Sequence, residues 1–303
     1  MMFMRFAGVL AMLATLWQAT ACAAGPKAGF GPREDRGRIE HDAITEASGL
    51  VASRLNPGVL WTHNDSGSSG AVFALDDRGR HLARVRIEGC PPGDWEDIAA
   101  GPGPDGRGHF LYIGDIGDNS ARKKSRSICR FPEPALDATA RPAELSVQAE
   151  RIRFVYPDGS HDAETLLADP ATGQLHVVTK REKQVGLYRI PNPSAPEGTL
   201  TAERLGNLPY TFIVGGDISA DGREILLKTY TAVLYWRRQP GQSIADTLQQ
   251  PATSLPYVAE VGGEAIAWAA DGSGYFTLSE ENLGIEARLY FYPRQRPPGG
   301  PAR

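Results

Sequence analysis

The chain has 303 residues, of which 41% are hydrophobic and 22% are charged, and its formal net charge is −4. It lacks the excess of basic residues that is typical of nucleic-acid binding, and after its first segment it has no apolar run long enough to span a membrane. Its 34 glycines and 23 prolines indicate many short strands joined by turns rather than a helical protein.

The N-terminal segment has the layout of a secretory signal. Arg5 precedes an apolar run over residues 6–17, and small residues follow. We therefore expect residues 1–24 to be a signal peptide. Two cleavage alternatives remain open. Ala-Thr-Ala-Cys22 resembles a bacterial lipobox, which would make Cys22 a lipid anchor and the protein's link to a membrane, whereas cleavage just after it would release a soluble protein. The expected location is the periplasm or cell envelope, or outside the cell.

The rest of the chain divides into three parts. Residues 25–37 read as a flexible tether, residues 38–293 as one domain, and residues 294–303, rich in proline and glycine, as a disordered tail. In an oxidising compartment the two cysteines of the domain, Cys90 and Cys129, are natural disulfide partners. Two separately buried thiols are the alternative.

A short phrase, an acid followed by small and aliphatic residues, recurs along the domain. It recurs at intervals of 50, 68, 53 and 47 residues. The five phrases start at Glu46, Glu96, Glu164, Asp217 and Glu264. A period of this size is typical of propeller blades.

Each phrase is followed by a turn and then by further apolar segments. In the first repeat these are residues 59–62, 72–75 and 82–87. Four short antiparallel strands in roughly 40–50 residues predict a blade, so we expect an all-β fold, a β-propeller of five four-stranded blades. The longest interval leaves a sixth blade open, and a β-sandwich array is the alternative fold.

The fifth blade lacks a fourth strand of its own. The segment Arg38–Ile44 stands ahead of the first phrase, and we expect it to pair with the strand at 288–292. Pairing of the N- and C-terminal strands would close the ring and remove its exposed edges.

Acidic side chains are expected to converge at one mouth of the central channel. The first strand of a blade starts there and the antiparallel second strand ends there, so both contribute. The candidate metal ligands are Glu46, Glu96, Glu164, Asp217 and Glu264 from strand starts, with Asn64, Asp115 and Glu280 from strand ends.

Clustered carboxylates repel one another, and a cation resolves that conflict. A ligand set of oxygens without histidine or cysteine favours a hard ion, Ca²⁺ before Mg²⁺. The alternative is structural: the acids cap strands or pair with Lys180, Arg181 and Lys228. No catalytic residue is identifiable from the sequence.

Blade two carries the most specific resemblance. Asp94-Trp-Glu-Asp-Ile-Ala99, Leu111-Tyr-Ile-Gly-Asp-Ile-Gly-Asp-Asn119 and Arg130-Phe-Pro-Glu-Pro134 resemble a group of uncharacterised exported bacterial β-propeller proteins. More distantly, the acid-led blades resemble the calcium propellers of the SMP-30-like gluconolactonase, paraoxonase and phytase types. That resemblance implies Ca²⁺ on the channel axis and hydrolysis of lactones or phosphoesters, and it extends to Glu46 as a ligand.

Two functions follow as expectations. In the first, the propeller is a cell-envelope binding platform whose acidic, Ca²⁺-binding mouth takes a small molecule or an envelope protein. In the second, it is a Ca²⁺-dependent hydrolase of lactones or phosphoesters, in which the ion polarises a carbonyl or phosphoryl oxygen.

Overall fold

The computed structural model describes residues 29–65, 70–137, 142–191, 198–281 and 284–295. The expected signal peptide with Cys22 lies outside these residues, as does most of the expected tail. Within the described ranges, no helix is long and apolar enough to cross a membrane.

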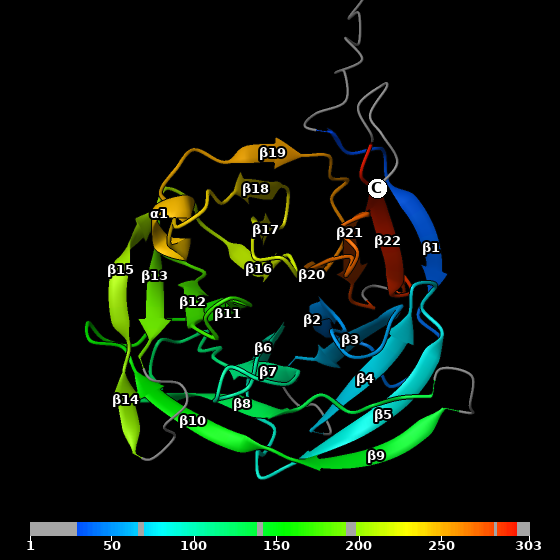
Figure 1. Cartoon of the computed structure of the whole chain (residues 1–303), viewed down its shortest axis with the longest axis horizontal. Coiled ribbons are helices and arrows are strands. Elements are labelled where there is room, and N and C mark those ends of the chain that lie inside the picture. The colour runs from blue at the N-terminus through cyan, green and yellow to red at the C-terminus, as the bar shows by residue number, and fades with distance from the viewer. Residues whose placement is uncertain (1–28, 66–69, 138–141, 192–197, 282–283, 296–303) are drawn as a thin grey trace, which may run out of the picture.

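Five sheets, each built on four antiparallel strands, are arranged around a central axis, as predicted for a five-bladed β-propeller (Figure 1). The first strand of every blade lies closest to the axis. These innermost strands are β2 (Ala47–Ala52), β6 (Trp95–Gly101), β11 (Ala163–Ala168), β16 (Ile213–Ile218) and β20 (Gly263–Trp268). The second strands are β3 (Val59–Asn64), β7 (Phe110–Asp115), β12 (Leu175–Thr179), β17 (Glu224–Thr229) and β21 (Gly274–Ser279).

The third and fourth strands lie progressively farther from the axis (Figure 1). The third strands are β4 (Ala71–Asp76), β8 (Arg126–Pro132), β13 (Val185–Ile190), β18 (Val233–Arg237) and β22 (Arg288–Pro293). The fourth strands are β5 (His81–Glu88), β10 (Glu150–Val155), β15 (Glu203–Leu208), β19 (Thr253–Leu255) and β1 (Glu34–Arg38). A short helix, α1 (Ile244–Leu248), precedes β19.

The long second repeat contains an added strand rather than a sixth blade. After blade two's third strand the chain returns to blade one, where β9 (Ala143–Gln148) pairs parallel to β5. Blade two likewise gains β14 (Thr199–Thr201), which pairs parallel to β10. These strands widen two blades at their outer edge.

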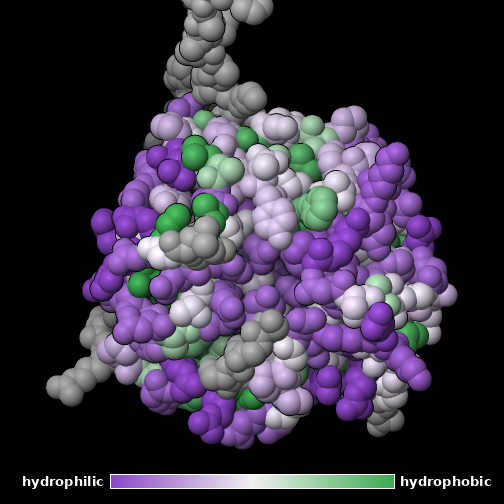
Figure 2. All heavy atoms as spheres, turned by 180° about the vertical axis from the view of Figure 1, so that it is seen from behind, coloured by the Kyte–Doolittle hydropathy of each residue, from purple (hydrophilic) through white to green (hydrophobic). Residues whose placement is uncertain are grey.

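Burial follows the distance of a strand from the axis. Every residue of the five innermost strands is buried, whereas β5 and β9 alternate between covered and exposed residues. Strands buried on both faces read as continuous apolar runs, and half-buried strands alternate. The face seen in Figure 2 is mostly hydrophilic, with hydrophobic residues in small groups.

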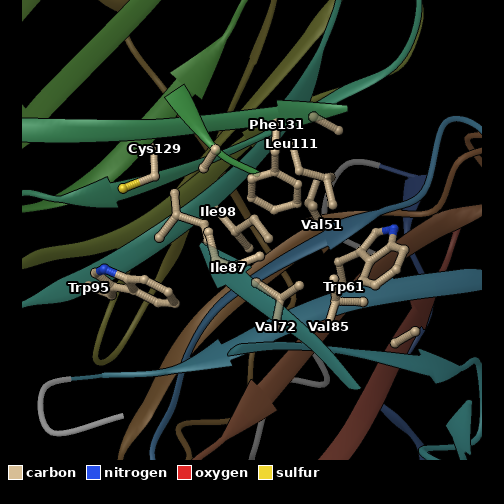
Figure 3. Packing of buried hydrophobic residues seen from close by; sticks show 14 of the residues in the cluster. Val51, Trp61, Val72, Val85, Ile87, Trp95, Ile98, Leu111, Cys129 and Phe131 are labelled. Carbon is tan, nitrogen blue, oxygen red and sulfur yellow. The ribbon is translucent and has the colours of Figure 1, made fainter. Parts of the chain in front are cut away.

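The apolar core fills the wedges between neighbouring blades. Figure 3 shows one such cluster, which contains Trp61 of blade one together with Ile98 and Phe131 of blade two. The predicted disulfide is confirmed at the same interface. Cys90, between β5 and β6, is bonded to Cys129 of β8, with a Cα–Cα distance of 6.0 Å.

The ring is closed by β1, which pairs antiparallel to β22. The closing strand is Glu34–Arg38, not Arg38–Ile44, so residues 34–37, expected in the tether, belong to the last blade. Ahead of it, Phe30 is buried against Trp268 and Tyr275. The pattern of hydrophobic residues does not reveal this strand, because the strand is charged and lies at the outer edge. Backbone hydrogen bonds and the Arg288–Asp35 ion pair stabilise it there.

Candidate metal centre

Each innermost strand begins with a register shift of the β-bulge type, in which one residue has no partner on the second strand. A bulge bends its strand and changes the direction of the side chain. The unpaired residues are Ser48, Glu96, Glu164, Val214 and Glu264. Three blades therefore carry a glutamate at the equivalent position, the unpaired residue of the innermost strand.

The residue two positions before the bulge is acidic in three blades. In blade order these residues are Glu46, Asp94, Asp162, Phe212 and Gly262. Blades two and three thus carry an Asp-x-Glu sequence with both acids near the start of the innermost strand. Negative charge is concentrated on this side of the ring.

Two overlapping groups of carboxylates result, and Glu96 belongs to both. Oxygens of Glu96, Asp162 and Glu164 lie within 4.8 Å of one another, and all three residues are buried. Oxygens of Asp65, Asp94 and Glu96 lie within the same distance, with Asp65 and Asp94 half-buried. We call these five residues together with Glu264 and Glu280 the acidic mouth.

Glu96 is buried, and its carboxylate has no hydrogen-bond partner among the residues that the structure describes. Its relative exposure is 3%, and no described residue donates to its carboxylate. Gly117 lies directly against it, since a Cβ added there would stand 1.9 Å from Oε1 of Glu96. A buried carboxylate normally accepts several hydrogen bonds or binds a cation, so Glu96 points to an interaction that the protein alone does not supply.

Lys180 follows β12 and is the buried cation of the acidic mouth. Its ammonium donates to Oε1 of Glu164 and lies 3.8 Å from Oε1 of Glu264. Oε2 of Glu164 is buried and has no hydrogen-bond partner in the described part of the chain. Burial acts to lower the pKa of Lys180, but Glu164, Tyr230 and Glu264 raise it, so the lysine remains charged.

Tyr230 and Glu280 complete the side of the mouth formed by blades four and five. The Tyr230 hydroxyl donates to Oε1 of Glu264 at 2.8 Å, and burial raises the tyrosine's pKa to about 12. Burial and the charges of Glu264, Asp65 and Glu46 raise the pKa of Glu280 to about 7. The Tyr230 hydroxyl therefore keeps its proton at neutral pH and acts as a hydrogen-bond donor, whereas the Glu280 carboxyl group can exchange its proton near that pH.

The acids of the mouth are hard to ionise together. Burial, followed by repulsion from Glu164, Asp65 and Asp94, raises the pKa of Glu96 well above its ordinary value of 4.5. Burial and repulsion from Glu264 raise the pKa of Glu164 to about 8 in spite of Lys180. A divalent cation would relieve both effects by displacing protons.

Asp217 lies deeper and joins two blades. Its Oδ1 accepts the N–H of Ile218, and its Oδ2 accepts the N–H of Trp268 in the next blade at 2.8 Å. Asp97 acts in the same way, accepting N–H groups of Ile98 and Leu166. Innermost strands have a free backbone edge, and these buried carboxylates satisfy part of it.

The other predicted ligands lie around the acidic mouth and have structural partners. Glu46 is exposed, and its N–H donates to Oδ1 of Asn64, whose amide in turn donates to Ala43. Asp115 accepts the N–H of Asp94 and the hydroxyl of Ser127. Asp115 therefore positions the loop that carries Asp94.

Three members of the mouth were not among the predicted ligands: Asp65, Asp94 and Asp162. Asp162 accepts a hydrogen bond from the N–H of Asp118 at 2.7 Å and forms an ion pair with Arg181. The repeated Asp-x-Glu of blades two and three was the available signal for Asp94 and Asp162. Asp65 has no such repeat, and its signal was its place directly after Asn64 at the end of a second strand.

No protein-family model matches the chain, and no curated protein matches it in sequence. One solved structure, of a functionally unknown protein from Desulfotomaculum acetoxidans, is similar over 80% of this chain and 68% of that chain, with 14% identity and a TM-score of 0.41. The order of the strands within the five sheets defines the class: the chain is a β-propeller of five blades.

Proposed function

We propose that this chain is an exported propeller that binds a divalent cation, Ca²⁺ before Mg²⁺, among Glu96, Asp162 and Glu164. We call this place the inner cation position. The observation that carries the proposal is that two buried carboxyl groups lack donors among the described residues: the Glu96 carboxylate accepts from none of them, and Oε2 of Glu164 has no partner there. An ion would satisfy both acceptors and relieve the burial and repulsion that raise the pKa values of the two carboxyl groups.

The chemistry of the donors supports a hard ion. The two sets of three acidic residues in the mouth contain no histidine and no cysteine. Carboxylate and carbonyl oxygens suit Ca²⁺, which accepts six to eight oxygen ligands in flexible geometry. Mg²⁺ demands near-octahedral geometry and keeps its waters, so it is the second choice. The distant resemblance to calcium propellers points the same way.

A bound ion would make the mouth a binding platform for a partner at the cell envelope. The coordination that three carboxylates leave open is available to a ligand oxygen. The Lys180 ammonium, which has three donor hydrogens and donates to Glu164, stands beside it. A small molecule with oxygen donors, or an acidic segment of an envelope protein, fits this arrangement. The location rests on the N-terminal signal sequence.

One observation favours a second candidate, Ca²⁺-dependent hydrolysis of lactones or phosphoesters. Glu280 lies at the same mouth with a pKa of about 7. A carboxyl group with a pKa near the working pH is suited to general acid–base catalysis. In this candidate a bound ion would polarise the carbonyl or phosphoryl oxygen of the substrate, and Glu280 would take a proton from the attacking water and return it to the leaving oxygen.

Thermal unfolding of chelator-treated protein with and without added Ca²⁺ tests the proposal. Calcium at a hundredfold excess over its dissociation constant should add about 2.7 kcal/mol to the free energy of unfolding and raise the Tm. Glu96→Gln should lose this shift, whereas Glu203→Gln, in an exposed ion pair on β15, should retain it. Equal Tm values with calcium and with chelator in the wild type would refute the proposal.

The same preparations separate the two functions. If the protein is a hydrolase, turnover in a panel of lactones and phosphoesters should require Ca²⁺ and fall on Glu280→Gln. If it is a binding platform, calcium should stabilise it while the whole panel remains unhydrolysed.

A further inference from the structure

Lys123 occupies the more exposed group of carboxylates. Its Nζ donates to Oδ2 of Asp94 at 2.7 Å and to the backbone oxygen of Gly117, also at 2.7 Å. A carboxylate together with a carbonyl oxygen is the kind of ligand set that Ca²⁺ takes in proteins. The Lys123 side chain is 42% exposed, so its ammonium can leave for solvent without burying a charge.

We propose that the acidic mouth takes a second divalent cation, among Asp65, Asp94 and Glu96, and that Lys123 holds this place when the ion is absent. We call it the outer cation position. The inference rests on the proposed function, since Glu96 would bridge the two ions. Glu96 is suited to this role because it belongs to both carboxylate groups and is buried with no described residue donating to either oxygen.

The two positions differ in burial, and this predicts unequal affinities. At the inner position all three carboxylates are buried, whereas Asp65 and Asp94 of the outer position are half-buried. Carboxylates near bulk solvent attract an ion less strongly, because water screens their charge. The outer ion must also displace the Lys123 ammonium from Asp94, whereas Lys180 can stay on Oε1 of Glu164 while Oε2 binds the inner ion. The inner position should therefore fill first.

Lys123 and Lys180 hold different groups, so the two positions can be changed separately. Lys123 contacts Asp94, whereas Lys180 contacts Glu164 and lies near Glu264. Replacing Lys123 removes a positive charge from the outer position and leaves every residue of the inner position in place. Lys124, the next residue in the chain, is exposed and offers a matched control.

Equilibrium dialysis of the chelator-treated full chain against a series of free Ca²⁺ concentrations, with calcium counted per chain, tests the inference. We expect two ions of unequal affinity in the wild type and one in Asp94→Asn. Lys123→Met should tighten the weaker step by about tenfold, because one competing positive charge is gone. Lys124→Met should leave both steps unchanged. If Asp94→Asn does not fold, Asp65→Asn tests the same position.

The outcomes separate this inference from the proposed function. One ion in both the wild type and Asp94→Asn would overturn the outer position and leave the inner position standing. No ion in the wild type would overturn both. Two ions with a weaker step that Lys123→Met does not change would overturn the role of Lys123.

Discussion

Gly117 is the residue that gives Glu96 its place in the mouth. A Cβ at position 117 would stand 1.9 Å from Oε1 of Glu96 and 2.8 Å from Cγ of Asp94. The N–H of Gly117 also donates to the backbone oxygen of Asp94. The loop after β7 therefore closes over two proposed ligands, and it can do so only because this residue has no side chain.

Gly117→Ala should weaken ion binding without unfolding the protein. The added methyl group meets the carboxyl ends of the Glu96 and Asp94 side chains. Both can swing away, but Glu96 then leaves both cation positions and Asp94 leaves the outer one. We expect calcium affinity to fall at least tenfold, as when groups that orient a ligand are lost, while the Tm in chelator changes little. Titration calorimetry measures the first and thermal unfolding the second. Unchanged affinity would show that Glu96 is not a ligand.

Glu96→Gln should change how the stability of the ion-free protein depends on pH. The pKa of Glu96 is raised above 4.5 by folding, so its contribution to stability is fully present below pH 4.5 and is lost as pH rises through the folded pKa. Glutamine cannot ionise. In chelator, variant and wild type should be nearly equal at pH 4.5, and the variant should gain up to about 1.4 kcal/mol per pH unit above it.

Urea unfolding at pH 4.5, 6 and 8 measures that difference. Glu203→Gln is again the control, because Glu203 is an exposed partner of Arg189 on an outer strand. A difference between Glu96→Gln and wild type that stays constant with pH would mean that burial does not raise the pKa of Glu96.

Phe212 has a strained backbone at the mouth. Its φ is 54°, in the left-handed region, and its side chain is 46% exposed. A non-glycine residue there costs about 1–2 kcal/mol, so Phe212→Gly should be more stable than Phe212→Ala by about 1 kcal/mol. Ala121, with φ 50°, should respond in the same way to Ala121→Gly. Urea unfolding of the three variants decides this. An alanine variant as stable as the glycine variant would mean that no strain is stored.

Phe30 should matter as much as a core residue, although it precedes the predicted domain. Its ring is 2% exposed and packs against Trp268, Tyr275 and the guanidinium of Arg294. Phe30→Ala should cost roughly 3–5 kcal/mol in urea unfolding, the range of buried phenylalanines. A loss below 1 kcal/mol would show that the ring closes without this residue.

The blades could be predicted from the sequence because each repeat has its own turns and apolar strands. The sequence did not show which residues of different blades occupy equivalent positions in the mouth. A bulge adds a residue that an ungapped comparison cannot see, so Glu46 was aligned with Glu96, whereas the pairing places Ser48 at that position. Asp217 likewise lies three residues beyond Val214, the bulge of its strand.

The closing strand was predicted at the wrong residues for a related reason. Strand β1 is a charged segment at the outer edge, stabilised by backbone bonds to β22 and by Arg288 rather than by apolar burial. Hydrophobic periodicity carries no information about such a strand.

Anomalous diffraction from crystals grown with calcium tests the central claim most directly. The account predicts an anomalous peak bonded to Glu96, Asp162 and Glu164, with Oε2 of Glu164 as a ligand. At saturating calcium, a mouth without such a peak, in which Glu96 still has no partner, would contradict the account.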